Sequence, residues 1–249
     1  MNILLLILVP LLTAIAALLS RNAQQVKWVS LTGSAAQVIL AFVLLMAYRS
    51  EVAADNAGPM YFEQTYALFP AWNINFHIGV DGISIAMILL TSFVVVAGVL
   101  VSWNVQKMIK EFYFLLLLLG LGAYGFFISL DLFVLFFFLE IAVIPKYLLI
   151  GIWGSGKKEY SANKLALMLM GGSALVLVGL LGLYFSSGRS FDLLQLSQMN
   201  ISTQAQHIIF PLLFVGFGVF TALFPLTPGC RMDTHLHLQP DQCFSLASP

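Results

Sequence analysis

Long apolar stretches are the feature of this sequence that most restricts its fold. A helix that crosses a bilayer needs about 20 mostly apolar residues, and seven stretches meet that requirement. They cover residues 2–20, 27–48, 82–104, 112–129, 132–153, 164–186 and 206–225. Charged residues make up 9% of the chain, against about 25% in a soluble domain. The sequence therefore predicts an all-α, polytopic membrane helix bundle with about seven transmembrane helices.

The charge balance and the cysteines argue against several function classes. The formal net charge is zero, so we expect no nucleic-acid partner. Both cysteines, Cys230 and Cys243, lie near the C-terminus, so a disulfide framework in the body of the chain is not expected. We find no metal-ligand spacing, phosphate-binding loop or nucleophile motif before residue 226. The apolar composition predicts that the helices of this chain are in contact with the lipid bilayer.

Basic residues in the connections predict the orientation. The connections after the first, third and fifth stretches, with their flanks, contain Arg21, Lys27, Lys107, Lys110, Lys157, Lys158 and Lys164, against Glu111 and Glu159. The connections after the second, fourth and sixth contain Arg49 and Arg189, against Glu51, Asp55, Glu63, Asp81, Asp131 and Asp192. By the positive-inside rule, the first set faces the cytoplasm and the N-terminus lies outside.

One apolar stretch, Leu132 to Trp153, carries a carboxylate, Glu140, near its middle. A charge at that depth in a bilayer costs roughly 2.5–3.5 kcal/mol on insertion scales. Glu140 has three explanations: a neutral packing carboxyl, one partner of an ion pair, or a site that takes up and releases a proton. Because intramembrane acids are functional by default, we treat Glu140 as the candidate for proton transfer.

Lys146 is the second ionisable residue of this stretch. It follows Glu140 by six residues, which is about 9 Å along a helix and some 120° around it. The two side chains are therefore not ideally placed for an ion pair on a straight helix, although a kink at Pro145 would change that. Lys146 is either a charge partner of Glu140 or a side chain that extends to the cytoplasmic edge.

Polar residues at the ends of the stretches have structural explanations. Asp81 is predicted to cap the third helix, and Asp131 to cap a helix in the turn before the fifth. His77 and His207 lie at the edges of stretches, and we predict that both are membrane-interface residues.

Two of the connections between the apolar stretches are themselves predicted to lie at the membrane interface. The connection 49–81 is the longest, and its aromatic residues suit a position at the membrane interface. Residues 191–196 are predicted to form a short interfacial helix.

Three short patterns carry a family resemblance. They are Phe76-His77-Ile78-Gly79-Val80-Asp81-Gly82-Ile83-Ser84; Ser129-Leu130-Asp131-Leu132-Phe133 followed by Phe138-Leu139-Glu140-Ile141-Ala142-Val143-Ile144-Pro145; and Gly216-Phe217-Gly218-Val219-Phe220-Thr221-Ala222-Leu223-Phe224-Pro225. Together they resemble the antiporter-like membrane subunits of NADH-quinone oxidoreductase (respiratory complex I). The resemblance covers residues 1–225, which would form one domain, the N-terminal half of a fourteen-helix fold with inverted repeats. Mrp-type cation/proton antiporter subunits and membrane-bound hydrogenase subunits are the nearest alternatives.

The resemblance implies a role in proton transport. Subunits of this family conduct protons across the cell (inner) membrane, together with other membrane subunits, while NADH and quinone react elsewhere in the complex. It therefore implies an enzyme subunit with no redox centre and no bound cofactor. Glu140 matches the family's proton-carrying glutamate, whereas the lysine of the family's seventh span falls at Phe220. Lys146 is a candidate for the missing positive partner. A membrane scaffold without transport activity is a third hypothesis, against which Glu140 argues.

Residues 226–249 depart from the family. Their two cysteines, with His235 and His237, raise the alternative of a metal site. One possible choice of codons for Leu226 to Gln239, however, reads His-Thr-Trp-Val-Pro-Asp-Gly-His-Ala-Ser-Ala-Pro-Thr-Ala when translation starts one base before the Thr227 codon. That is the family's motif. We therefore expect a frame-shifted, disordered tail without a metal, on a truncated chain that conducts no protons alone; sequencing the gene tests this.

Overall fold

The apolar stretches form the helices of the structure, a computed structural model that describes residues 3–53, 60–69, 72, 74–154, 158–199 and 201–221. The helices are α1 (Leu5–Leu19), α2 (Ala23–Ala53), α3 (Gly82–Val101), α4 (Ile109–Ile128), α5 (Leu132–Trp153), α6 (Lys158–Ser186), α7 (Leu193–Gln198) and α8 (Thr203–Phe220). Six of these helices are long and apolar enough to cross a membrane, and the apolar α1 has 15 residues. The predicted all-α membrane bundle is confirmed.

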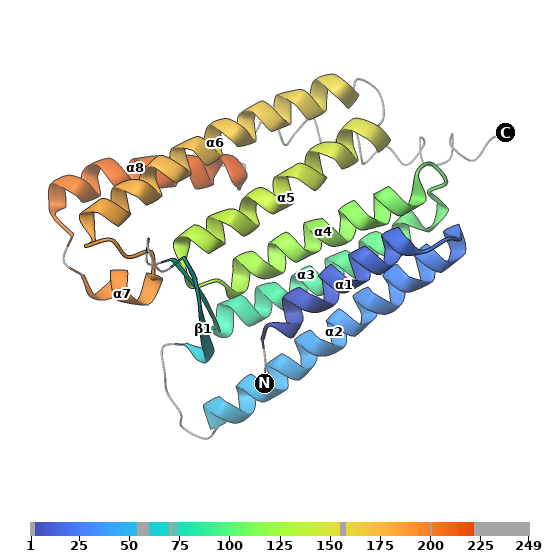
Figure 1. Cartoon of the computed structure of the whole chain (residues 1–249), viewed down its shortest axis with the longest axis horizontal. Coiled ribbons are helices and arrows are strands. Elements are labelled where there is room, and N and C mark those ends of the chain that lie inside the picture. The colour runs from blue at the N-terminus through green and yellow to red at the C-terminus, as the bar shows by residue number, and fades with distance from the viewer. Residues whose placement is uncertain are drawn as a thin grey trace. The chain divides into compact units, whose positions relative to one another are not determined.

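The described chain divides into two compact units. The first contains the residues up to Pro145 and the segment from Ser187 to the end of α7; the second runs from Lys146 to Ser186 and continues from Ile201. In the first unit, α1 packs against α2 and α4, and α3 packs against α2 and α4 (Figure 1). The residues predicted to form a tail, 226–249, lie outside the described residues.

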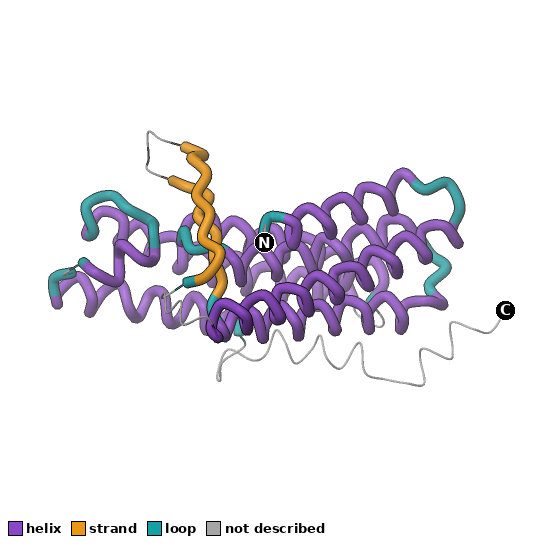
Figure 2. Tube along the Cα trace, turned by 90° about the horizontal axis from the view of Figure 1, so that it is seen from below, coloured by secondary structure: helices purple, strands orange, loops and turns teal. Residues whose placement is uncertain are grey.

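A β-hairpin stands where the sequence predicted a membrane-interface connection. Strands β1 (Tyr61–Phe69) and β2 (Ile74–Val80) are antiparallel, and Figure 2 shows them crossing the direction of the helices. Ile78 and Val80 of β2 are fully buried, in the same core as Tyr124 and Ile128 of α4. Most of β1 is exposed. The hairpin therefore belongs to the core of the first unit through one strand.

Helices α6 and α8 of the second unit approach closely at glycines. A Cβ atom added at Gly216 would lie 2.9 Å from the backbone nitrogen of Val176, and one added at Gly179 would lie 2.7 Å from Leu213 Cδ2. Small residues at such positions let two helix backbones come together, which is how helices associate in a bilayer.

Gly172→Ala is expected to destabilise the second unit by about 1–3 kcal/mol through overpacking. The added Cβ would lie 2.8 Å from Val219 Cβ and 3.3 Å from the Gly216 carbonyl oxygen. Gly171→Ala is the matched control, because nothing lies within 4 Å of a Cβ there, and alanine is the better helix former by about 1 kcal/mol. Thermal unfolding in detergent compares the two variants, and equal stability would contradict the packing described.

Candidate functional site

Helix α5 begins at a side-chain cap. Asp131 Oδ1 accepts hydrogen bonds from the backbone N–H groups of Phe133 (2.9 Å) and Val134 (3.2 Å), which confirms its predicted role. Burial raises the pKa of the Asp131 carboxyl above its ordinary value; backbone N–H donors, including that of Asn75, lower it, and the nearby Asp192 carboxylate raises it further. The N–H donors therefore stabilise a charge that burial disfavours.

The middle of α5 packs against α4 through two glycines. A Cβ added at Gly122 would lie 2.9 Å from Ala142 Cβ and 3.0 Å from the Phe138 carbonyl oxygen, and one added at Gly125 would overlap the ring of Phe138. Phe138 and Ala142 therefore face α4. Since a helix turns about 100° per residue, Glu140 lies about 180° from that face, and it is half-buried.

Lys146 lies on the same helix, which continues unbroken through Pro145 to Trp153. The spacing expected from the sequence is therefore kept, with Lys146 six residues beyond Glu140. Lys146 is half-buried, and its side chain forms no hydrogen bond or ion pair with another described residue. Its role as a charge partner of Glu140 stays a prediction.

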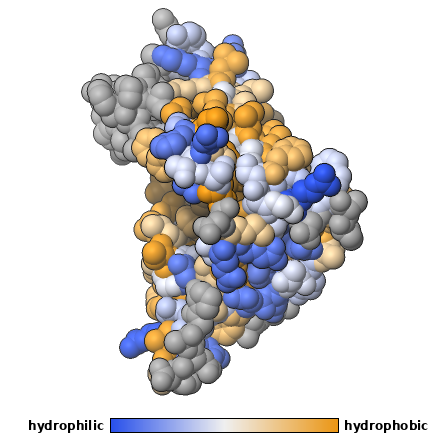
Figure 3. Space-filling model, turned by 90° about the vertical axis from the view of Figure 1, so that its left-hand side faces the viewer, coloured by the Kyte–Doolittle hydropathy of each residue, from blue (hydrophilic) through white to orange (hydrophobic). Residues whose placement is uncertain are grey.

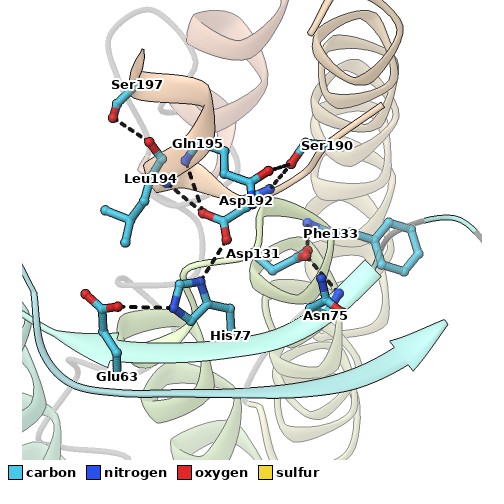
Figure 4. Close-up of polar contacts among 10 residues, drawn as sticks. All are labelled: Glu63, Asn75, His77, Asp131, Phe133, Ser190, Asp192, Leu194, Gln195 and Ser197. Atoms are coloured by element: carbon cyan, nitrogen blue, oxygen red, sulfur yellow. Dashed lines mark hydrogen bonds and ion pairs between the residues drawn. The ribbon is translucent and has the colours of Figure 1, made fainter. Parts of the chain in front are cut away.

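A polar cluster that the sequence did not predict lies at the start of α5 (Figure 4). His77 Nδ1 lies 2.9 Å from Asp192 Oδ2, and His77 Nε2 lies 3.7 Å from Glu63 Oε2. Asp192 also caps α7, because its Oδ1 accepts hydrogen bonds from Leu194 N (2.9 Å) and Gln195 N (3.3 Å). The cluster therefore joins the hairpin to the connection between α6 and α7.

The side chain of His77 is buried in the protein, and its place at a membrane interface stays a prediction. The residue is 7% exposed, whereas His207, for which the same prediction stands, is exposed. A short helix is present where one was predicted at residues 191–196, but it begins and ends two residues later, as α7 (Leu193–Gln198). Figure 3 shows one face of the molecule, on which hydrophilic side chains gather beside apolar ones.

The cluster also gathers three connections that the charge pattern assigned to one side of the membrane. Asn75 N in β2 donates a hydrogen bond to Asp131 Oδ2 (3.2 Å). The backbones of Asp131 and Asp192 form an antiparallel β-bridge, which joins the α4–α5 connection to the α6–α7 connection. The connections after α2, α4 and α6 thus meet, as alternating helices require.

The described residues contain no cluster of side chains that could form a metal site. No group of three or more His, Cys, Asp or Glu side chains in that part of the chain has a geometry that could hold a metal ion. Cys230, Cys243, His235 and His237, the residues of the alternative metal site, lie outside the described residues.

Sequence comparisons connect the chain to membrane subunits of quinone reductases. Residues 129–228 match the family described as NADH:quinone oxidoreductase/Mrp antiporter, TM. NAD(P)H-quinone oxidoreductase chain 4 of Angiopteris evecta chloroplasts is 34% identical over 194 residues, 77% of this chain and 39% of that protein. Chain 4 of Gloeobacter violaceus is 32% identical over 222 residues, 88% of this chain and 41% of that protein. This chain thus spans about two fifths of the length of these relatives.

Chains of two respiratory membrane complexes of known structure share the fold of this chain. A chain of respiratory complex I from Thermus thermophilus with bound NADH matches with a TM-score of 0.79 at 24% identity, over 90% of this chain and 45% of that chain. A chain of the membrane-bound sulfane sulfur reductase, an archaeal respiratory membrane complex, matches with a TM-score of 0.73 at 23% identity, over 91% and 46%. Both matches cover nearly all of this chain and less than half of the other.

Proposed function

Because this chain belongs to the antiporter-like membrane subunits of NADH-quinone oxidoreductase and is similar to chain 4 of that complex, we propose that it supplies part of a proton path across the membrane. Within this proposal, the chain works with other membrane subunits of the respiratory complex, which couples electron transfer from NADH to quinone to proton translocation. The redox reactions take place in other subunits, and this chain binds neither NADH nor quinone. The observation that carries the proposal is Glu140, a half-buried carboxylate in the middle of an apolar helix.

Glu140 is the residue to which we assign proton transfer. In an apolar span, burial disfavours the charged form of a carboxyl group, so the neutral form becomes accessible. Such a group can therefore take up and release a proton. The close contact of α4 with α5 at Gly122 sets the position of the helix that carries it. Glu140 lies on the other side of α5, where a proton path would have to reach it.

We also propose an orientation for the subunit in the inner membrane. The connections that meet at His77 are the acidic ones, and the connections at the other ends of the helices are basic. By the positive-inside rule the hairpin then faces outward, and the N-terminus lies on the same outer side.

Inside-out membrane vesicles that contain the assembled complex test the proposed function. NADH should acidify vesicles with the wild-type chain, and deleting the gene should lower that acidification per NADH oxidised. Replacing Na⁺ by K⁺ should leave the rate unchanged, because the proposed ion is the proton. Release of lumenal protons on addition of Na⁺ to already acidified vesicles would instead identify a Mrp-type antiporter subunit. Equal acidification with and without the gene would identify a scaffold without transport activity.

Lys146→Met is expected to slow proton translocation several-fold. Lys146 follows Glu140 by six residues, about 9 Å along a helix, and a positive charge at a separation of that order favours the carboxylate by on the order of 1 kcal/mol after screening. Methionine removes that charge with little change in size. Lys110→Met is the matched control, because Lys110 is also half-buried but lies in the first turn of α4. Proton translocation by Lys146→Met at the wild-type rate would rule out Lys146 as a charge partner of Glu140.

A further inference from the structure

His77 lies at the centre of the contact between the hairpin and the α6–α7 connection. Its partner Asp192 Oδ2 accepts only, so the Nδ1 atom at 2.9 Å carries the proton and donates it. The other ring nitrogen, Nε2, lies 3.7 Å from Glu63, too far for a direct hydrogen bond. Glu63 is 42% exposed, whereas Asp192 is 16% exposed and also fixed by capping α7. The contact made by Nδ1 is therefore the one that holds the ring.

Backbone hydrogen bonds extend this contact to the start of α5. Leu130 N donates to the carbonyl oxygen of His77 (2.8 Å), and Leu193 N donates to the carbonyl oxygen of Leu130 (2.9 Å). Leu132 N, at the first residue of α5, donates to the carbonyl oxygen of Phe191 (3.0 Å). The segment between α4 and α5 is thus held on one side by β2 and on the other by the residues next to Asp192.

Aromatic contacts carry the same link into the helix. Phe76, the neighbour of His77 in β2, has its ring centroid 6.3 Å from that of Phe138, two residues before Glu140. Phe191, the neighbour of Asp192, has its ring centroid 5.7 Å from that of Phe133. Each partner of the His77–Asp192 hydrogen bond therefore places an adjacent ring on α5.

We propose that His77 is a positioning residue for proton transfer at Glu140. The hydrogen bond from Nδ1 to Asp192 closes the hairpin and the α6–α7 connection around the first turns of α5, and this fixes the helix that carries the carboxylate. The distance from Asp131 to Glu140 is about 13 Å along the helix, so His77 acts through the backbone of α5 and the two ring contacts. This role rests on the proposed function of Glu140.

Two amide variants distinguish the two ring nitrogens. The amide nitrogen of an asparagine reaches about the position of histidine Nδ1, and that of a glutamine about the position of Nε2. His77→Asn should therefore keep the hydrogen bond to Asp192, whereas His77→Gln and His77→Leu should lose it. His207→Leu is the matched control, because His207 is exposed, and Glu63→Gln should behave as the wild type.

Hydrogen exchange in the assembled complex is the first measurement. Loss of the bond in His77→Gln and His77→Leu should lower the protection of the amides of Leu130, Leu132 and Leu193 by about tenfold, and His77→Asn should retain it. NADH-driven acidification of vesicles, the second measurement, should fall several-fold in the same two variants and recover in His77→Asn. Wild-type protection in His77→Gln would overturn the proposal, and so would lowered protection with unchanged acidification. Protection does not depend on Glu140, so failure of the proposed function is recognised separately, by normal acidification in Glu140→Gln.

Discussion

Glu140→Gln is expected to lower the proton flux through this subunit by more than about tenfold, the range in which removal of a positioned proton-transfer group acts. Glutamine keeps the size of the side chain and its hydrogen-bonding oxygen but cannot release a proton at neutral pH. The measurement is the initial rate of vesicle acidification per NADH oxidised, in the assembled complex. A packing role for the carboxyl predicts the opposite, because glutamine would serve it nearly as well.

Two further variants make the Glu140 result specific. Glu140→Asp keeps an ionisable group about one methylene shorter and should restore part of the flux. Glu111→Gln is the matched control, because Glu111 is an exposed glutamate in the first turn of α4, and it should translocate protons at the wild-type rate. Equal loss in Glu111→Gln and Glu140→Gln would mean that the substitutions act on assembly and not on proton transfer.

Gly122→Leu is expected to separate α4 from α5, with a loss of stability of about 3 kcal/mol or more. The obstacle to a side chain at this position is largely backbone: an added Cβ would lie 3.0 Å from the Phe138 carbonyl oxygen and 3.1 Å from Ala142 N. Backbone atoms cannot rotate away as the end of a long side chain can, so α5 itself has to move. The helix that carries Glu140 would move with it.

Thermal unfolding in detergent and recovery of the assembled complex both report on Gly122→Leu. Gly98→Ala in α3 is the control, since a Cβ there meets Leu116 at 3.6 Å, an ordinary contact distance. If Gly122→Leu assembled and unfolded like the wild type, the described approach of α4 and α5 would be wrong.

The helices and their caps were predictable because both depend on local sequence. Twenty apolar residues in a row leave few alternatives to a membrane helix. Asp81 Oδ1 accepts a hydrogen bond from Ser84 N at 2.7 Å, three residues along the chain, and the Asp131 cap spans two and three residues. Such short-range contacts follow from residue type and position.

The hairpin and the His77 cluster were not predicted, and the reasons differ. Ile74, Phe76, Ile78 and Val80 alternate with other residues, a pattern typical of a strand, so β2 had a local signal that the aromatic content of the connection obscured. His77 and Asp192 are 115 residues apart. No spacing rule joins two residues at that separation, so only the fold brings them together.

The protonation of Glu140 during turnover is the central claim, and infrared difference spectroscopy measures it directly. Spectra of the assembled complex, recorded with and without NADH oxidation, should contain the C=O stretch of a carboxyl group that gains or loses a proton. We expect this band to disappear in Glu140→Gln and to persist in Glu111→Gln. The same band at full intensity in Glu140→Gln would show that Glu140 is not the carboxyl group that changes protonation.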